Sequence, residues 1–94
     1  MPELVEIFKA LSSEPRFAIL ELLKQRPLCV NAITHKLDLT QSAVSQHLKI
    51  LRQAGLVSAR KEGNYMHYSV NEAELEKQKA FVDKLFSMDN EQVV

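Results

Sequence analysis

Polar side chains that could bind nucleic acid recur between positions 41 and 53, on one face of a predicted helix. Amides and hydroxyls hydrogen-bond base edges in the major groove or phosphates, and Lys and Arg neutralise phosphates. No Asp or Glu lies between Thr40 and Lys61, whereas a merely solvated helix usually mixes both charges. The pattern indicates a nucleic-acid surface; the alternative is a polar surface helix of a small bundle. This outer face comprises Gln41, Ser42, Ser45, Gln46, Lys49, Arg52 and Gln53.

A single helix must carry these side chains. Thr40 can accept a hydrogen bond from an N–H group of the first turn, and Gly55 can adopt the left-handed conformation that ends a helix. We therefore predict a helix from about Gln41 to Ala54. Its opposite face is apolar and would pack on a core, and His47 is expected to contact DNA or to pack there. The apolar face comprises Val44, Leu48 and Leu51, widened by Ala43, Ile50 and Ala54.

A shorter helix is predicted directly upstream, from about Val30 to Leu37. Asp38 to Thr40 would form the tight turn between the two helices. Together they span about residues 30–54 and form a helix-turn-helix unit, whose second helix enters the major groove with its N-terminal half.

A β-hairpin is predicted after Gly55, because the period of the apolar residues changes from 3.6 to 2 over about residues 57–70. Gly63 and Asn64 lie at its centre, where a tight turn is favoured. The tip could reach a phosphate or a minor groove, and the alternative is a turn that is charged for solubility. The tip residues expected to touch DNA are Arg60, Lys61, Gly63 and Asn64.

Three further helices are predicted outside this unit. The first spans about residues 3–11, and the second follows the capping Ser12 and Ser13 and runs to about Lys24. The last spans about residues 72–88, with Asn71 as its cap and Glu74 able to complete a capping box. Beyond Asn90 we expect the chain to fray. The apolar positions are Leu4, Val5, Ile7, Phe8 and Leu11 in the first, Phe17, Ile19, Leu20, Leu22 and Leu23 in the second, and Leu75, Ala80, Phe81, Val82, Leu85, Phe86 and Met88 in the last.

The first and last helices carry more apolar surface than one small core can cover, which predicts a homodimer. One domain of 94 residues is expected. Its net charge is zero, yet positions 24–67 hold seven Lys and Arg against two Asp and Glu, so the middle is basic and the ends are acidic. A single Cys and the lack of a signal peptide or long apolar run favour a cytoplasmic protein.

The order of these elements, with TQSAVSQHLKILRQAGLV and ARKEGNYMHYSV, resembles the ArsR/SmtB family of winged helix-turn-helix repressors. The resemblance covers about residues 3–88. It implies a mainly α fold of about five helices and two strands with the hairpin as the wing. It also implies a homodimer, joined by the first and last helices, that binds an imperfect palindrome in double-stranded DNA and blocks transcription.

Not all of the sensor residues of that family are present in this sequence. Its arsenic-type members begin the third helix with Cys-x-Cys, but here Cys29 is followed two positions later by Asn31. Its zinc-type members use His on the last helix, and residues 71–88 contain none. We therefore predict neither metal nor cofactor at those sites. Cys29 is interpreted as a buried apolar residue, as a sensor thiol near a helix N-terminus, or as a ligand helped by His35.

The sequence favours a sequence-specific, dimeric DNA-binding repressor released by an unidentified signal. A winged-helix module for protein contacts is the alternative, and the long segment without acidic residues argues against it. An enzyme is the weakest interpretation, because no Gly-rich phosphate loop or catalytic arrangement is present. In the leading interpretation, Gln41, Ser42, Ser45 and Gln46 meet the major groove, and Lys49, Arg52, Arg60 and Lys61 contact phosphates.

Overall fold

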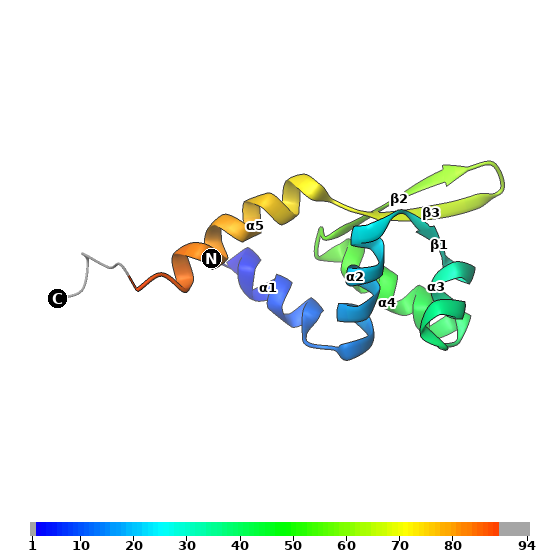
Figure 1. The fold of residues 1–94 in the computed structure, drawn as a ribbon, viewed down its shortest axis with the longest axis horizontal. Helices are drawn as coiled ribbons and strands as arrows, with labels where there is room; N and C mark the ends of the chain where they lie inside the picture. The colour runs from blue at the N-terminus through cyan, green and yellow to red at the C-terminus, as the bar shows by residue number, and fades with distance from the viewer. Residues whose placement is uncertain (1, 89–94) are drawn as a thin grey trace.

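The structure is a computed structural model that describes residues 2–88. The expected fraying beyond Asn90 lies outside the described residues. Within residues 2–88, five helices and three strands follow one another (Figure 1). In order they are α1 Pro2–Leu11, α2 Glu14–Gln25, β1 Leu28–Cys29, α3 Val30–Leu37, α4 Gln41–Gln53, β2 Val57–Glu62, β3 Tyr65–Val70 and α5 Glu72–Leu85.

Side-chain caps start three of the helices where the sequence predicts them. Ser13 Oγ accepts from the Arg16 N–H at 3.4 Å, and Thr40 Oγ1 accepts from the Ala43 N–H at 3.0 Å. Asn71 Oδ1 accepts from the Glu74 N–H at 3.2 Å. Each bond satisfies one of the N–H groups that a helix leaves free at its start. The helix boundaries at these three sites are therefore confirmed.

The predicted capping box at α5 is wrong. The Asn71 N–H donates instead to the Leu56 carbonyl at 2.9 Å, which ties the start of α5 to the residue directly before β2. Glu74 Oε1 accepts from the Gln78 side chain at 3.0 Å. The Glu74 carboxylate thus bonds a side chain one turn further along α5 and not the N–H group of Asn71.

α5 ends at Leu85 rather than at about residue 88. A Ser, which is a poor helix former, follows two positions later.

The sheet has one strand more than predicted. Its order is β1-β3-β2, and both neighbours run antiparallel to β3. Glu62 pairs with Tyr65, so Gly63 and Asn64 form a two-residue turn, and Gly63 takes a φ of 61°. The wing, residues 57–70, is therefore confirmed. β1 was missed because two residues are too few to show a period of 2.

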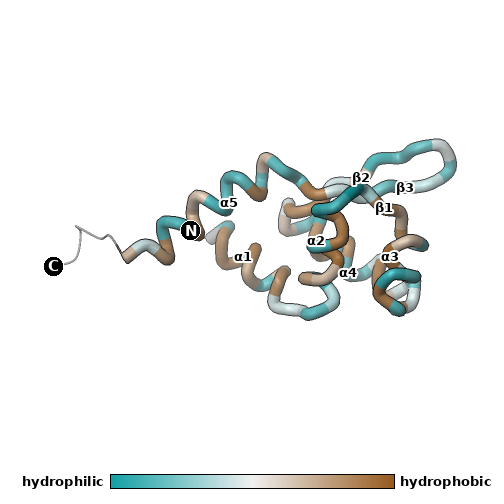
Figure 2. Tube along the Cα trace, viewed as in Figure 1, coloured by the Kyte–Doolittle hydropathy of each residue, from teal (hydrophilic) through white to brown (hydrophobic). Residues whose placement is uncertain are grey.

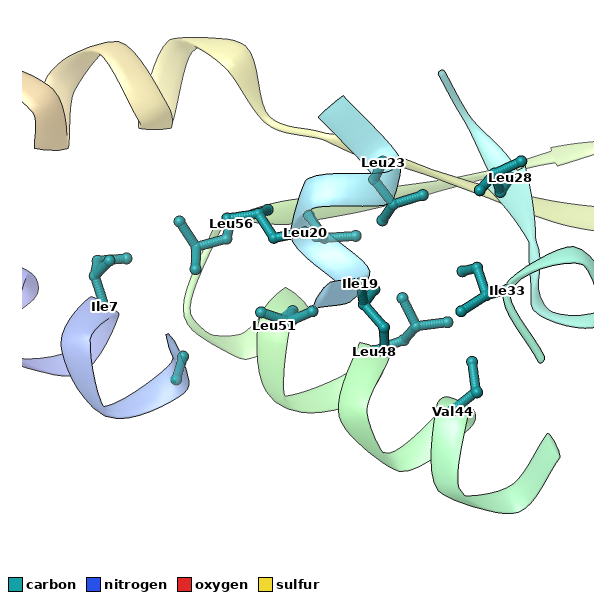
Figure 3. Packing of buried hydrophobic residues seen from close by; sticks show 12 residues of the cluster. Ile7, Ile19, Leu20, Leu23, Leu28, Ile33, Val44, Leu48, Leu51 and Leu56 are labelled. Atoms are coloured by element: carbon teal, nitrogen blue, oxygen red, sulfur yellow. The ribbon is translucent and has the colours of Figure 1, made fainter. Parts of the chain in front are cut away.

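One apolar core lies beneath α4 and the base of the wing. Figure 3 shows side chains from α1, α2, α3 and α4 converging there. The inner face of α4 is confirmed, since Val44, Leu48 and Leu51 are all buried. Leu56 closes the core after Gly55, whose φ of 83° supplies the predicted helix stop. The fully buried side chains are Ile19, Ile33, Val44, Leu48, Leu51 and Leu56.

Several residues assigned to apolar faces lie outside this core, among them one each on α1, α2 and α4. Phe8 is 43% exposed, Phe17 is 50% exposed and Ile50 is 36% exposed. Ala10 is buried on α1 instead. The apolar stripes are wider than the neighbouring elements that cover them, so the outer residues of each stripe stay in contact with solvent.

Candidate nucleic-acid interface

The outer face of α4 is open to solvent along its whole length. All seven of its polar residues are exposed, from Gln41 in the first turn to Gln53 in the last. α4 contains no acidic residue in its first turn, and Arg52 lies in its last turn. Packing of the opposite face on the core fixes how this face is presented. The structure thus gathers the predicted major-groove residues on one surface.

The wing tip supplies a second group of exposed side chains. Arg60, Lys61, Gly63 and Asn64 are all exposed, and Figure 2 shows hydrophilic residues along much of the hairpin. Arg60 Nη2 lies 3.8 Å from Glu62 Oε2. An ion pair between side chains this exposed is weak, so Arg60 can exchange Glu62 for a phosphate.

A hydrogen bond that the sequence did not predict links the two helices of the helix-turn-helix unit. Gln41 Nε2 donates to Asn31 Oδ1 at 3.2 Å. Both residues are exposed. Asn31 was considered only as the residue that replaces a family cysteine. The contact between residues ten positions apart has no signature in the local pattern, so only the fold reveals it.

His47 differs from the other residues of α4 that were expected to contact DNA. It is half-buried, and its Nδ1 is buried without a hydrogen-bond partner among the described residues. Burial of the ring and, second, the nearby charge of Arg16 lower the pKa of His47 below its ordinary value of 6.5. Arg16 itself donates from Nε to the Ala10 carbonyl at 2.6 Å. This environment favours packing over DNA contact for His47.

The lowered pKa of His47 makes stability depend on pH. In the unfolded chain the imidazole takes up a proton below about pH 6.5, whereas the folded chain resists it. The stability is therefore fully present above pH 6.5 and is lost as the pH falls towards the folded-state pKa. We expect the urea midpoint to fall between pH 7.5 and pH 5.5 by more in the parent protein than in His47→Gln. Equal falls in the two proteins would contradict this assignment.

Cys29 lies at the junction of β1 and α3. It is half-buried, pairs with His67 in the sheet and is the N-cap residue of α3 without a side-chain cap bond. The position near a helix N-terminus is confirmed. Whether the residue is a sensor thiol or a packing residue stays a prediction.

Metal-binding residues do not come together in the part of the chain that the structure describes. No group of three or more His, Cys, Asp or Glu there could hold a metal ion. Asn31, where the family's second thiolate would stand, carries an amide that already accepts from Gln41. Residue 31 therefore cannot supply the second thiolate of the arsenic-type pair. Across residues 2–88, no helix has the length and hydropathy needed to cross a membrane.

Fold and surface together define a winged helix-turn-helix protein: four helices contribute to the core, and a hairpin flanks a helix with one exposed polar face. Residues 13–59 match the family model described as "Bacterial regulatory protein, arsR family". The chain is 36% identical to the transcriptional activator HlyU of Vibrio cholerae, a match covering 93% of this chain and 81% of that protein. The chain belongs to the arsR family and is a winged helix-turn-helix transcriptional regulator.

Solved structures agree with this assignment. An ArsR-like transcriptional regulator from Rhodococcus sp. RHA1 superposes with a TM-score of 0.82 at 31% identity, over 89% of this chain and 79% of that one. The homodimeric winged helix-turn-helix DNA-binding domain of Mb0332 from Mycobacterium bovis gives a TM-score of 0.76 at 30% identity, over 89% of this chain and 78% of that one.

Proposed function

We propose that the protein is a homodimeric repressor that binds a palindromic site in promoter DNA. The observation that carries the proposal is the pairing of the exposed, acid-free outer face of α4 with an exposed basic wing tip. Ser42, Ser45 and Gln46 meet base edges in the major groove, with Gln41 beside them. Lys49, Arg52, Arg60 and Lys61 contact phosphates, and Gly63 and Asn64 bring the wing to the minor groove.

The dimer forms through α1 and α5. These helices lie together at the end of the molecule opposite the wing tip (Figure 1), and Lys77 Nζ of α5 pairs with Glu3 Oε2 of α1 at 3.3 Å. Large apolar side chains remain exposed on and just after them, and apolar and polar segments alternate along α5 (Figure 2). Soluble monomers rarely expose so much apolar surface. These side chains are Val5, Phe8, Leu85, Phe86 and Met88.

Two-fold symmetry sets the form of the DNA site. Two copies of α4 related by that axis enter major grooves about 34 Å apart, or a multiple of that distance, so the site is an inverted repeat. A dimer bound at such a site within a promoter blocks the access of RNA polymerase and so represses transcription. One relative, HlyU, is named as a transcriptional activator. Transcription from the target promoter must therefore be measured together with DNA binding.

A comparison of two single variants tests the assigned roles. Lys61→Ala removes a phosphate contact, so it should weaken binding to operator and random DNA alike and lower the salt slope by about one unit. Gln46→Ala removes a base contact, so it should weaken operator binding by about 1–3 kcal/mol and leave random DNA almost unchanged. Fluorescence anisotropy titrations at several salt concentrations measure both. Identical effects of the two variants on both DNAs would refute the division of roles.

A further inference from the structure

A small cleft separates the helix-turn-helix unit from the wing. Its volume is about 180 Å³, and its wall comes from the start of α3, the first residue of α4 and the wing tip. A cleft of this volume holds several water-sized groups. The phosphorus of a phosphodiester and its four oxygens fit, whereas a base pair does not. The lining residues are Cys29, Val30, Asn31, Gln41, Asn64, Tyr65 and Met66.

The polar groups of this wall include several hydrogen-bond donors and no carboxylate. Asn31, Gln41 and Asn64 contribute side-chain amides and Tyr65 contributes a phenol, and no Asp or Glu takes part. The bond from Gln41 Nε2 to Asn31 Oδ1 uses the acceptor of Asn31. Both N–H bonds of the Asn31 amide are thereby left for an external acceptor. By contrast, a larger cleft elsewhere, of about 440 Å³, has three carboxylates in its wall, from Glu3, Glu6 and Glu74, beside Lys9 and Arg16.

The position of the cleft matches the path of a DNA strand. When α4 lies in a major groove and the wing reaches the adjacent minor groove, the sugar–phosphate backbone between the two grooves must pass between α4 and the wing. Asn31 and Gln41 form one side of this passage, and Asn64 and Tyr65 form the other. A backbone phosphate there would meet amide and hydroxyl donors from both sides.

We propose that this cleft is a seat for one phosphodiester group of the DNA backbone, with the linked amides of Asn31 and Gln41 as its principal donors. The seat rests on the proposed DNA-binding function and adds a contact from α3. Gln41 then acts through its bond to Asn31 on the backbone rather than on a base. Sequence preference is left to Ser42, Ser45 and Gln46.

Two substitutions at position 31, one that adds a negative charge and one that removes the amide, provide the first test. Asn31→Asp places a carboxylate against the phosphate and should weaken operator and random duplex alike by about tenfold. Asn31→Ala should weaken both by about fivefold and leave the salt slope unchanged, because no charge is lost. The control Gln25→Glu adds the same charge at an exposed position on α2, outside the proposed dimer and DNA surfaces, and its affinity should equal that of the parent protein. Circular dichroism verifies that each variant is folded.

A thiol placed in the cleft provides the second test and does not depend on lost affinity. In Cys29→Ser/Met66→Cys the only thiol occupies an exposed position of the cleft wall, since Met66 is 39% exposed. Operator and random duplex should each slow its alkylation at least about fivefold, whereas inorganic phosphate alone should not. In the control Cys29→Ser/Gln25→Cys, whose thiol lies at an exposed position of α2, neither duplex should change the rate.

The outcomes separate the seat from the function. If Gln46→Ala and Lys61→Ala weaken binding while Asn31→Asp does not, or if duplex leaves the thiol at position 66 unprotected, the seat is overturned and the repressor function stands. If inorganic phosphate alone protects the thiol as well as duplex does, the cleft binds free phosphate and the backbone assignment is overturned. If the folded parent protein binds no duplex, the proposed function itself fails.

Discussion

Phe8→Glu is expected to convert the protein into a monomer and to weaken operator binding by at least about a hundredfold, because the second half-site is then lost from the same complex. Phe8 is 43% exposed on α1, beside Val5 at 51%. In the dimer its ring would be buried against the partner's apolar surface. A carboxylate at that position would have to be desolvated without a partner charge, which opposes association.

Phe17→Glu is a closely matched control. Phe17 is 50% exposed, so the same substitution is made at a similar exposure, but on α2 rather than on the proposed dimer helices. Sedimentation equilibrium should give a monomer for Phe8→Glu and a dimer for Phe17→Glu, with matching circular dichroism spectra. Operator titrations on the same samples complete the comparison. A monomer for Phe17→Glu and a dimer for Phe8→Glu would move the interface to α2 and contradict the proposal.

Local chemistry was sufficient to predict the elements that present the proposed DNA-binding surface. Thr40 and Gly55 mark the ends of α4, and the change of period after Gly55 marks the wing. These signals act between neighbouring residues, so one sequence reveals them. The exposure of individual apolar side chains could not be predicted in this way. The apolar character of Phe8, Phe17 and Ile50 was plain, but which neighbours would cover them depends on how distant helices pack.

Two contacts at the site join residues that are far apart in the sequence, and the sequence did not predict them. Asn31 meets Gln41 across the turn of the helix-turn-helix unit. Arg16 lies near His47 only because α2 packs against α4. Neither pair has a characteristic spacing, since each depends on the arrangement of whole elements. The sequence therefore predicted which face of α4 is exposed, but not the cleft beside it or the environment of His47.

Leu48→Ala should destabilise the protein by about 2–5 kcal/mol, the cost of removing a large side chain from a packed core. Leu48 is 1% exposed on the inner face of α4, directly beneath the outer face. Ile50→Ala is the control on the same helix. Ile50 is 36% exposed, so its truncation leaves little cavity, and Ala is the better helix former. Its cost should stay below about 1 kcal/mol.

Urea unfolding at one fixed protein concentration measures both variants, because the stability of a dimer depends on concentration. Nearly equal midpoints for Leu48→Ala and Ile50→Ala would contradict the packing of α4. Since Leu48 is buried in the core, the folded fraction of Leu48→Ala should bind operator with the parent's affinity, and added operator should raise its urea midpoint. A loss of affinity that persists when the variant is fully folded would instead mean that Leu48 sets the orientation of α4, and with it the geometry of the outer face.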